Sequence, residues 1–178
     1  MSTIIYTILK IIYYFSKDKQ EYINNYFRSK GIKIGKDCKI YSNIITGESY
    51  LITIEDNVTI SNGVQLITHD NSIVKIVEGY TDVVGEIKIG KDSFIGAKSI
   101  ILPGVTLGEN IVVGSGSVVT KSFNENRIII AGNPAKKIRK IDKAYIEKIT
   151  KSALNIDGLN SKSKREKILL SKEKFIKR

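Results

Sequence analysis

The 178-residue sequence predicts an all-β fold, a solenoid of short parallel β-strands stacked in successive coils. Two observations predict it: aliphatic residues recur every six positions, and glycine often follows them directly. The clearest run of aliphatic residues is Ile89, Ile95, Ile101, Leu107, Val113 and Val119. A helix of period 3.6 cannot keep a strict period of six on one face, whereas one flat strand and one turn per hexad can. Hexads of this kind are typical of a parallel β-helix.

The same phase appears earlier in the chain, at Ile34, Ile40, Ile54, Ile60 and Leu66. A second position, four residues after each aliphatic, is usually small and is expected to face inward too, as at Cys38, Ser93, Ser99, Val105, Ile111, Ser117 and Phe123. With three hexads to a triangular coil, the repeat predicts roughly four coils, stacked at the ~4.8 Å spacing of neighbouring strands. The glycines are expected to allow corner conformations that a side chain would forbid.

Two segments interrupt the repeat, residues 46–53 and residues 69–86. A segment expelled from a solenoid lies outside it, and loops held by a rigid scaffold often carry function. His69, the only histidine in the chain, stands where the longer loop departs. This junction is therefore the first candidate for chemistry.

Three segments follow from the repeat: a helical segment at 1–30, a β-helix domain at 31–135 with the protruding loop 69–86, and a tail at 136–178. Residues Ile4, Ile8, Ile11, Ile12 and Phe15 fall on one helical face, which predicts an N-terminal amphipathic helix. It either covers the open end of the solenoid or makes peripheral contact with a membrane. Its apolar run is too short to span a bilayer and lacks a signal-peptide cleavage site.

Charge is unevenly distributed along the chain, whose net charge is +11. From Lys136 to Arg178 there are 15 Lys and Arg against 5 Asp and Glu. Such a tail is either solvated and partly helical, or binds phosphates, anionic lipid or nucleic acid. No aromatic interleaving or helix-turn-helix pattern accompanies it, so no nucleic-acid partner is expected.

A single cysteine, Cys38, excludes an intramolecular disulfide framework and a Cys-x-x-Cys metal clamp. We expect it to be a small buried residue in a protein of the reducing cytoplasm. The apolar N-terminal helix is compatible with work at the inner face of the membrane.

From Ile34 to Arg139 the sequence resembles the hexapeptide-repeat acyltransferases, especially the galactoside, maltose and polysaccharide O-acetyltransferases. The resemblance is most specific in IGKDSFIGAKSIILPGVTLGENIVVGSGSVVTKSF and in the following IIIAGNPAKKIR. It implies a left-handed β-helix, a homotrimer, and acetyl-CoA bound in a groove between neighbouring subunits. The N-terminal helix and the basic tail lie outside the resemblance.

The resemblance implies that His69 is the catalytic general base. A neutral imidazole can remove the proton of an attacking hydroxyl near pH 7, so direct acetyl transfer needs no protein nucleophile. Asp70 is adjacent, but consecutive side chains of an extended segment point to opposite faces. Glu48, Asp82 and Glu86 are alternative carboxylates to orient the imidazole, and the sequence does not choose among them.

Alignment with the sugar acetyltransferases implies acetyl-CoA contacts at Ala97, Ser115, Thr120, Lys121, Lys136 and Arg139. Backbone groups of the small residues Ala97 and Ser115 would follow the pantetheine arm, and an amide near Ala97 could stabilise an oxyanion. The three cationic residues either meet the coenzyme's phosphates or belong to the general basic face. For the acceptor, we expect binding by Asn43, Asn62 and Asp70.

A solenoid of this kind can carry several functions. A γ-class carbonic anhydrase needs three histidines around each zinc, so this chain is excluded from that class and no metal is expected. We favour transfer of acetyl to a sugar hydroxyl in surface-polysaccharide biosynthesis. Alternatives are an acetyltransferase for another small acceptor (amino acid, amino sugar or antibiotic) and a non-catalytic solenoid scaffold.

Overall fold

The computed structural model describes residue 4, residues 6–8 and residues 19–176 of the chain. It divides into two compact units, Met1–Arg139 and Lys140–Arg178.

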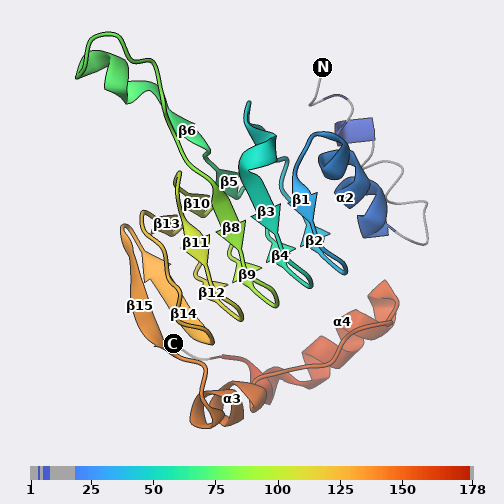
Figure 1. Cartoon of the computed structure of the whole chain (residues 1–178). Coiled ribbons are helices and arrows are strands. Elements are labelled where there is room, and N and C mark those ends of the chain that lie inside the picture. Colours follow the sequence, from blue (N-terminus) through green and yellow to red (C-terminus); the bar gives the residue numbers. More distant parts are fainter. Residues whose placement is uncertain (1–3, 5, 9–18, 177–178) are drawn as a thin grey trace. The chain divides into compact units, whose positions relative to one another are not determined.

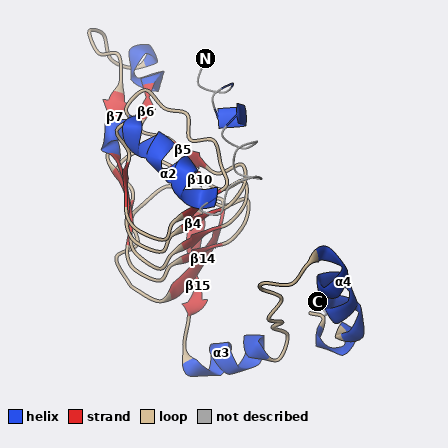
Figure 2. Ribbon diagram, turned by 90° about the vertical axis from the view of Figure 1, so that its right-hand side faces the viewer, coloured by secondary structure: helices blue, strands red, loops and turns tan. Residues whose placement is uncertain are grey.

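The first unit is a left-handed parallel β-helix, as predicted, whose short strands form three sheets around one core (Figures 1 and 2). The first sheet contains β1 (Lys33–Ile34), β3 (Ile52–Ile54), β8 (Ile87–Ile89) and β11 (Thr106–Leu107). The second contains β2 (Lys39–Ile40), β4 (Thr59–Ile60), β9 (Phe94–Ile95), β12 (Val112–Val113), β14 (Ile128–Gly132) and β15 (Ala135–Lys140). The third contains β5 (Gln65–Leu66), β10 (Ile100–Ile101) and β13 (Val118–Val119).

The predicted hexad phase fills the core. In the third sheet, for example, Leu66, Ile101 and Val119 are aligned in register and are all buried. The buried positions of the second set include Cys38, Ser93, Ser99, Val105, Ile111 and Ser117. Stacking one aliphatic on the next removes apolar surface from water along the whole solenoid, which stabilises it.

Glycine has the predicted role at three corners, because Gly63, Gly104 and Gly116 have φ values of 73°, 80° and 71°, which disfavour a side chain. The left-handed backbone positions at the corner between the first and second sheets are held by Asp37, Asn57, Asp92 and Asn110, with φ between 54° and 59°. Gly96 instead allows close packing of two coils, because an added Cβ would lie 2.5 Å from the Ser115 amide nitrogen and 2.5 Å from the Val113 carbonyl oxygen. The glycines that directly follow the aliphatic positions therefore indicate the close approach of two coils, and not a corner conformation.

Replacing Gly96 with alanine should destabilise the solenoid by roughly 1–3 kcal/mol, the usual cost of overpacking. The atoms that a Cβ would meet are backbone atoms of the next coil, which cannot move aside alone. Thermal unfolding should show a lower midpoint for G96A. Gly47→Ala is the matched control, since nothing lies within 4 Å of a Cβ at that position; equal midpoints for the two variants would contradict this account.

Helix α2 (Lys19–Ser29) covers the open edge of the first coil (Figure 1). Ile23 and Phe27 are buried, while polar side chains satisfy backbone groups that no further strand pairs. Asn24 Nδ2 donates to the Cys38 carbonyl at 3.0 Å, and Arg28 donates to the Ile34 and Gly35 carbonyls at 2.9 and 2.7 Å. The helix thus blocks the end at which another strand could add.

The N-terminal residues that the structure describes differ from the predicted amphipathic face. Tyr6 is buried and packs against Phe27, with ring centroids 5.8 Å apart, whereas Ile4 and Ile8 are exposed. The other predicted face residues, Ile11, Ile12 and Phe15, lie outside the described residues. Among the helices of the described chain, none is long and apolar enough to cross a membrane.

The solenoid continues beyond the predicted boundary at residue 135. The turn at Asn133 and Pro134 returns the chain as β15 beside β14, so the first compact unit extends to Arg139. The remaining tail is partly helical, as predicted, with α3 (Lys143–Thr150), α4 (Ser161–Leu170) and a 3-10 turn at Lys172–Lys174. The predicted boundary thus cut through a paired strand.

Candidate active site

The protruding loop is anchored at its base by a small antiparallel ribbon. β6 (His69–Asp70) pairs with β7 (Val83–Val84), with His69 opposite Val84, and a 3-10 helix at Asn71–Lys75 lies between them (Figure 1). The Gly85 amide donates to the Thr68 carbonyl at 2.9 Å, which ties the ribbon to the coil. His69 therefore occupies a fixed position at the edge of the solenoid, with 44% of its side chain exposed.

Glu48, from the shorter insertion, contacts the imidazole. Its Oε2 lies 2.7 Å from His69 Nδ1. A carboxylate only accepts hydrogen bonds, so Nδ1 must carry the proton in the neutral imidazole. Nε2 is then left with its lone pair, which is the protonation state that a general base needs.

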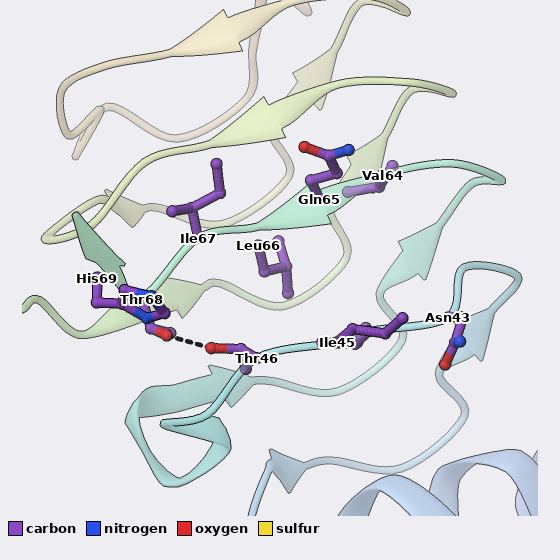
Figure 3. Close-up of a pocket in the computed structure, with 10 residues that line it drawn as sticks. Asn43, Ile45, Thr46, Val64, Gln65, Leu66, Ile67, Thr68 and His69 are labelled. Atoms are coloured by element: carbon purple, nitrogen blue, oxygen red, sulfur yellow. Dashed lines mark hydrogen bonds between the residues drawn. The ribbon is translucent and has the colours of Figure 1, made fainter. Parts of the chain in front are cut away.

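Two threonines hold Glu48 in place. Thr68, fully buried, donates its hydroxyl to Glu48 Oε2 at 2.8 Å, and Thr46 lies 3.4 Å from the same oxygen. The two hydroxyls also hydrogen-bond each other (Figure 3). The hydrogen bonds from Thr68 and then from His69 lower the pKa of the Glu48 carboxyl, which keeps it ionised at neutral pH.

Replacing Thr68 with valine should lower turnover about 10-fold, the order expected for losing one hydrogen bond to a charged group. Valine matches the shape of threonine but leaves Glu48 without its buried donor, so the imidazole is less firmly oriented. Steady-state kinetics should show the loss in kcat, with the KM for the acyl donor unchanged. Thr68→Ser retains the hydroxyl and should retain most of the activity; a serine variant as slow as the valine variant would contradict the role.

The other carboxylates considered from the sequence serve elsewhere. Asp70 accepts a hydrogen bond from the Ser72 amide at 2.8 Å and so caps the 3-10 helix, an interaction that lowers the pKa of its carboxyl. Its predicted contact with the acceptor is not supported by this geometry. Asp82 and Glu86 are exposed. Of the three candidate orienting carboxylates, the structure therefore brings Glu48 to the imidazole.

A pocket of about 260 Å³ opens beside His69 (Figure 3). Residues 43–46 and 64–69 line it, with Asn43 at the end away from His69. Gln65 contributes an amide, and Ile45 and Ile67 contribute apolar surface. Asn43 thus lines the pocket, whereas Asn62 does not.

Three of the residues expected to bind acetyl-CoA, Ala97, Ser115 and Thr120, lie along the two edges of the third sheet. Ala97 and Ser115 precede β10 and β13 and stack on each other, since the Gly116 amide donates to the Ala97 carbonyl at 2.8 Å. Asn62 precedes β5, at the same edge of the sheet as Ala97 and Ser115. Thr120 follows β13, at the edge where His69 follows β5. Within one chain, Ala97 and Ser115 therefore lie at the opposite edge of this sheet from His69.

The predicted cationic residues are partly brought together. Lys121 lies over the Phe123 ring, 5.8 Å from its centroid, and Lys136 and Arg139 both belong to β15. Lys136 is exposed and Arg139 is half-buried. The neighbouring Lys137 is held by Glu125 at 2.5 Å. Exposed cations such as Lys121 and Lys136 can attract phosphates. Both residues lie on segments other than the one that carries His69.

Sequence reasoning missed Thr68 and Thr46. One signal was available for Thr68: it stands two residues after the inward Leu66, and a period of two turns it inward as well. A buried hydroxyl requires a partner, which pointed to a polar contact at the loop base. Nothing in the sequence indicated Thr46, because it lies in an insertion outside the repeat.

Chemically, the site offers a proton acceptor, a carboxylate that orients it and a pocket that reaches it. In the described part of the chain, no group of three or more His, Cys, Asp or Glu residues could hold a metal ion. The imidazole, the Glu48 carboxylate and the pocket together are suited to general-base chemistry.

Comparison with known proteins identifies the family of the chain. A family model described as "Hexapeptide repeat of succinyl-transferase" matches residues 86–121. Protein CapG of Staphylococcus aureus is 42% identical over 143 residues, which cover 78% of this chain and 82% of that protein. The chain belongs to the hexapeptide-repeat acetyltransferase family, which confirms the prediction of an acyl-transferring enzyme.

Solved structures of the family show the same architecture. A maltose O-acetyltransferase from Clostridium difficile superposes with a TM-score of 0.58 at 28% identity, covering 77% of this chain and 84% of that one. A hexapeptide-repeat acetyltransferase of Vibrio cholerae in complex with acetyl-CoA gives a TM-score of 0.57 at 29% identity. The match covers 64% of this chain and 62% of the Vibrio chain.

Proposed function

We propose that this protein transfers an acetyl group from acetyl-CoA to a sugar hydroxyl, with His69 as general base. The observation that carries the proposal is the Glu48–His69 contact, which fixes the Nδ1 proton and leaves Nε2 as an acceptor beside the pocket. The solved maltose O-acetyltransferase supports a sugar acceptor, and the acetyl-CoA complex of the Vibrio enzyme supports the donor.

The chemistry needs one proton transfer in each direction. Nε2 of His69 removes the acceptor hydroxyl proton while the oxygen forms a bond to the thioester carbonyl carbon. The carbon–sulfur bond then breaks, and the imidazolium returns the proton to the departing thiolate. Glu48 stabilises the imidazolium between the two steps, and Thr68 keeps Glu48 in position. Atoms and charge balance without a protein nucleophile.

For the donor, we propose contacts with Ala97, Ser115, Thr120, Lys121, Lys136 and Arg139. Small side chains at Ala97 and Ser115 allow the pantetheine arm to approach the backbone. The exposed cations suit the coenzyme's phosphates. Because Ala97 and Ser115 lie across the third sheet from His69, one chain does not assemble the site alone.

A homotrimer resolves this separation, because each groove then takes its imidazole from one subunit and its Ala97 edge from another. Light scattering coupled to size-exclusion chromatography should therefore give three times the 19.9 kDa chain mass. A monodisperse monomer that is fully active would contradict the shared site.

The pocket's composition supports a sugar. Amides of Asn43 and Gln65 can hydrogen-bond hydroxyl groups, while Ile45 and Ile67 can cover the apolar face of a ring. We propose a role in surface-polysaccharide biosynthesis in the cytoplasm.

The test is release of coenzyme thiol from acetyl-CoA, followed colorimetrically with a panel of acceptors. Galactosides, maltose and amino sugars should stimulate release, and mass spectrometry of the product should show one added acetyl group. Stimulation by serine or an aminoglycoside, with none by sugars, would replace the sugar with another acceptor. No acceptor-dependent release from any class would favour the scaffold reading.

A further inference from the structure

The C-terminal unit has secondary structure but no core. Every described residue from 140 to 176 is at least partly exposed. Its large apolar side chains are among the exposed residues of the molecule: Ile146, Ile149, Leu159, Leu169, Leu170, Phe175 and Ile176. Exposed apolar surface on this scale is typical of an interaction site.

The helices of this unit are nevertheless specified by the sequence. Asp142 accepts from the Tyr145 amide at 2.8 Å and caps α3, and Asn160 accepts from the Ser163 amide at 2.9 Å and caps α4. Capped helices without a buried face gain their tertiary stability from something outside the unit. The apolar side chains are therefore available to a partner.

Charge indicates which partner. Residues 140–178 carry 12 Lys and Arg against 5 Asp and Glu, a net charge of +7, whereas residues 1–139 carry 17 against 13. The body of a second copy is itself positive, so it attracts this unit poorly. In α4 and after it, basic residues flank the apolar ones: Lys162, Lys164, Arg165, Lys167, Lys172 and Lys174 surround Leu169, Leu170 and Phe175.

We propose that the C-terminal unit is a membrane-docking element that binds the surface of a bilayer rich in anionic lipid. Its lysines and arginines contact the headgroups, and Leu169, Leu170, Phe175 and Ile176 enter the boundary between headgroups and acyl chains. A nucleic acid would satisfy the charge but would leave these apolar side chains in water. The element shares no residue with the proposed acetyl-transfer site and would concentrate the enzyme at the surface of the bilayer.

The test is co-sedimentation of the full chain with phosphatidylcholine vesicles that contain or lack phosphatidylglycerol. Binding should require phosphatidylglycerol and weaken with added salt. The triple variant Lys164→Gln, Arg165→Gln and Lys167→Gln should bind on the order of 100-fold more weakly, at about 1 kcal/mol for each charge removed. The matched control, Lys33→Gln, Lys36→Gln and Lys39→Gln, removes three exposed charges from the β-helix and should bind like the wild type.

A second variant separates membrane insertion from charge attraction alone. Leu170→Ser with Phe175→Ser keeps every charge and should reduce vesicle binding by about 10-fold or more. Acetyl transfer to a water-soluble acceptor should be unchanged in both tail variants. The proposal would be overturned if the chain did not bind phosphatidylglycerol vesicles, or if the β-helix control lost as much binding as the tail variant. It would also be overturned by tighter binding to duplex DNA than to vesicles, or by a tail variant that changed only the oligomeric state.

Discussion

Replacing His69 with alanine should lower turnover by roughly 10² to 10⁴, the usual contribution of a general base. Without the imidazole, the acceptor hydroxyl keeps its proton as it attacks. Coenzyme binding should be nearly unchanged, because the proposed donor contacts lie on other coils. Steady-state rates with saturating acceptor, together with calorimetric titration of acetyl-CoA, measure both quantities on one preparation.

The fold should survive this substitution, because the His69 side chain is 44% exposed and lies at the loop base. The thermal midpoint and the oligomeric state of H69A should therefore match the wild type. Loss of the oligomer, or a large fall in the midpoint, would mark the histidine as structural. An H69A enzyme with wild-type turnover would end the general-base account.

Replacing Glu48 with glutamine should also lower turnover by roughly 10² to 10⁴, because the substitution changes which nitrogen of the imidazole carries the proton. A glutamine amide can donate to Nδ1, which favours the tautomer that carries its proton on Nε2. That tautomer cannot accept the hydroxyl proton. Single-turnover kinetics with bound acetyl-CoA should show the loss in the chemical step.

The imidazole NMR signals provide a check on the cause. In its neutral form, the wild-type imidazole should show a protonated Nδ1 and an unprotonated Nε2, and E48Q should show the reverse. Asp82→Asn, a matched loss of one exposed carboxylate in the protruding loop, should keep wild-type turnover. Equal losses in E48Q and D82N would refute a specific role for Glu48.

The fold was largely readable from the sequence because a solenoid repeats one local rule. Each of Ile60, Ile95 and Val113 fills the same core position in successive coils, so a period of six reports the three-dimensional register directly. The corner role predicted for glycine is confirmed at Gly104 and Gly116. It is wrong for Gly96, where the close approach of the next coil excludes a side chain. The return strand at Ala135–Lys140 was missed because it breaks the hexad phase.

The site was less predictable because it depends on insertions. His69 was evident as a single histidine at a break in the repeat, but the pairing with Glu48 joins two insertions separated by 21 positions. Glu48, Asp82 and Glu86 look alike in sequence. Only the folded chain, in which Thr68 donates to Glu48 beside His69, shows which carboxylate reaches the imidazole. Asn62 was displaced from the pocket because the corner position carries it to the far edge of the third sheet.

Calorimetric titration of the purified chain with acetyl-CoA tests the central claim most directly, because it requires no knowledge of the acceptor. The account predicts micromolar binding at about one coenzyme per chain, weakened by Lys136→Ala or Arg139→Ala and retained in His69→Ala. The absence of any binding heat at coenzyme concentrations well above the micromolar range would contradict an acetyl-CoA-dependent transferase.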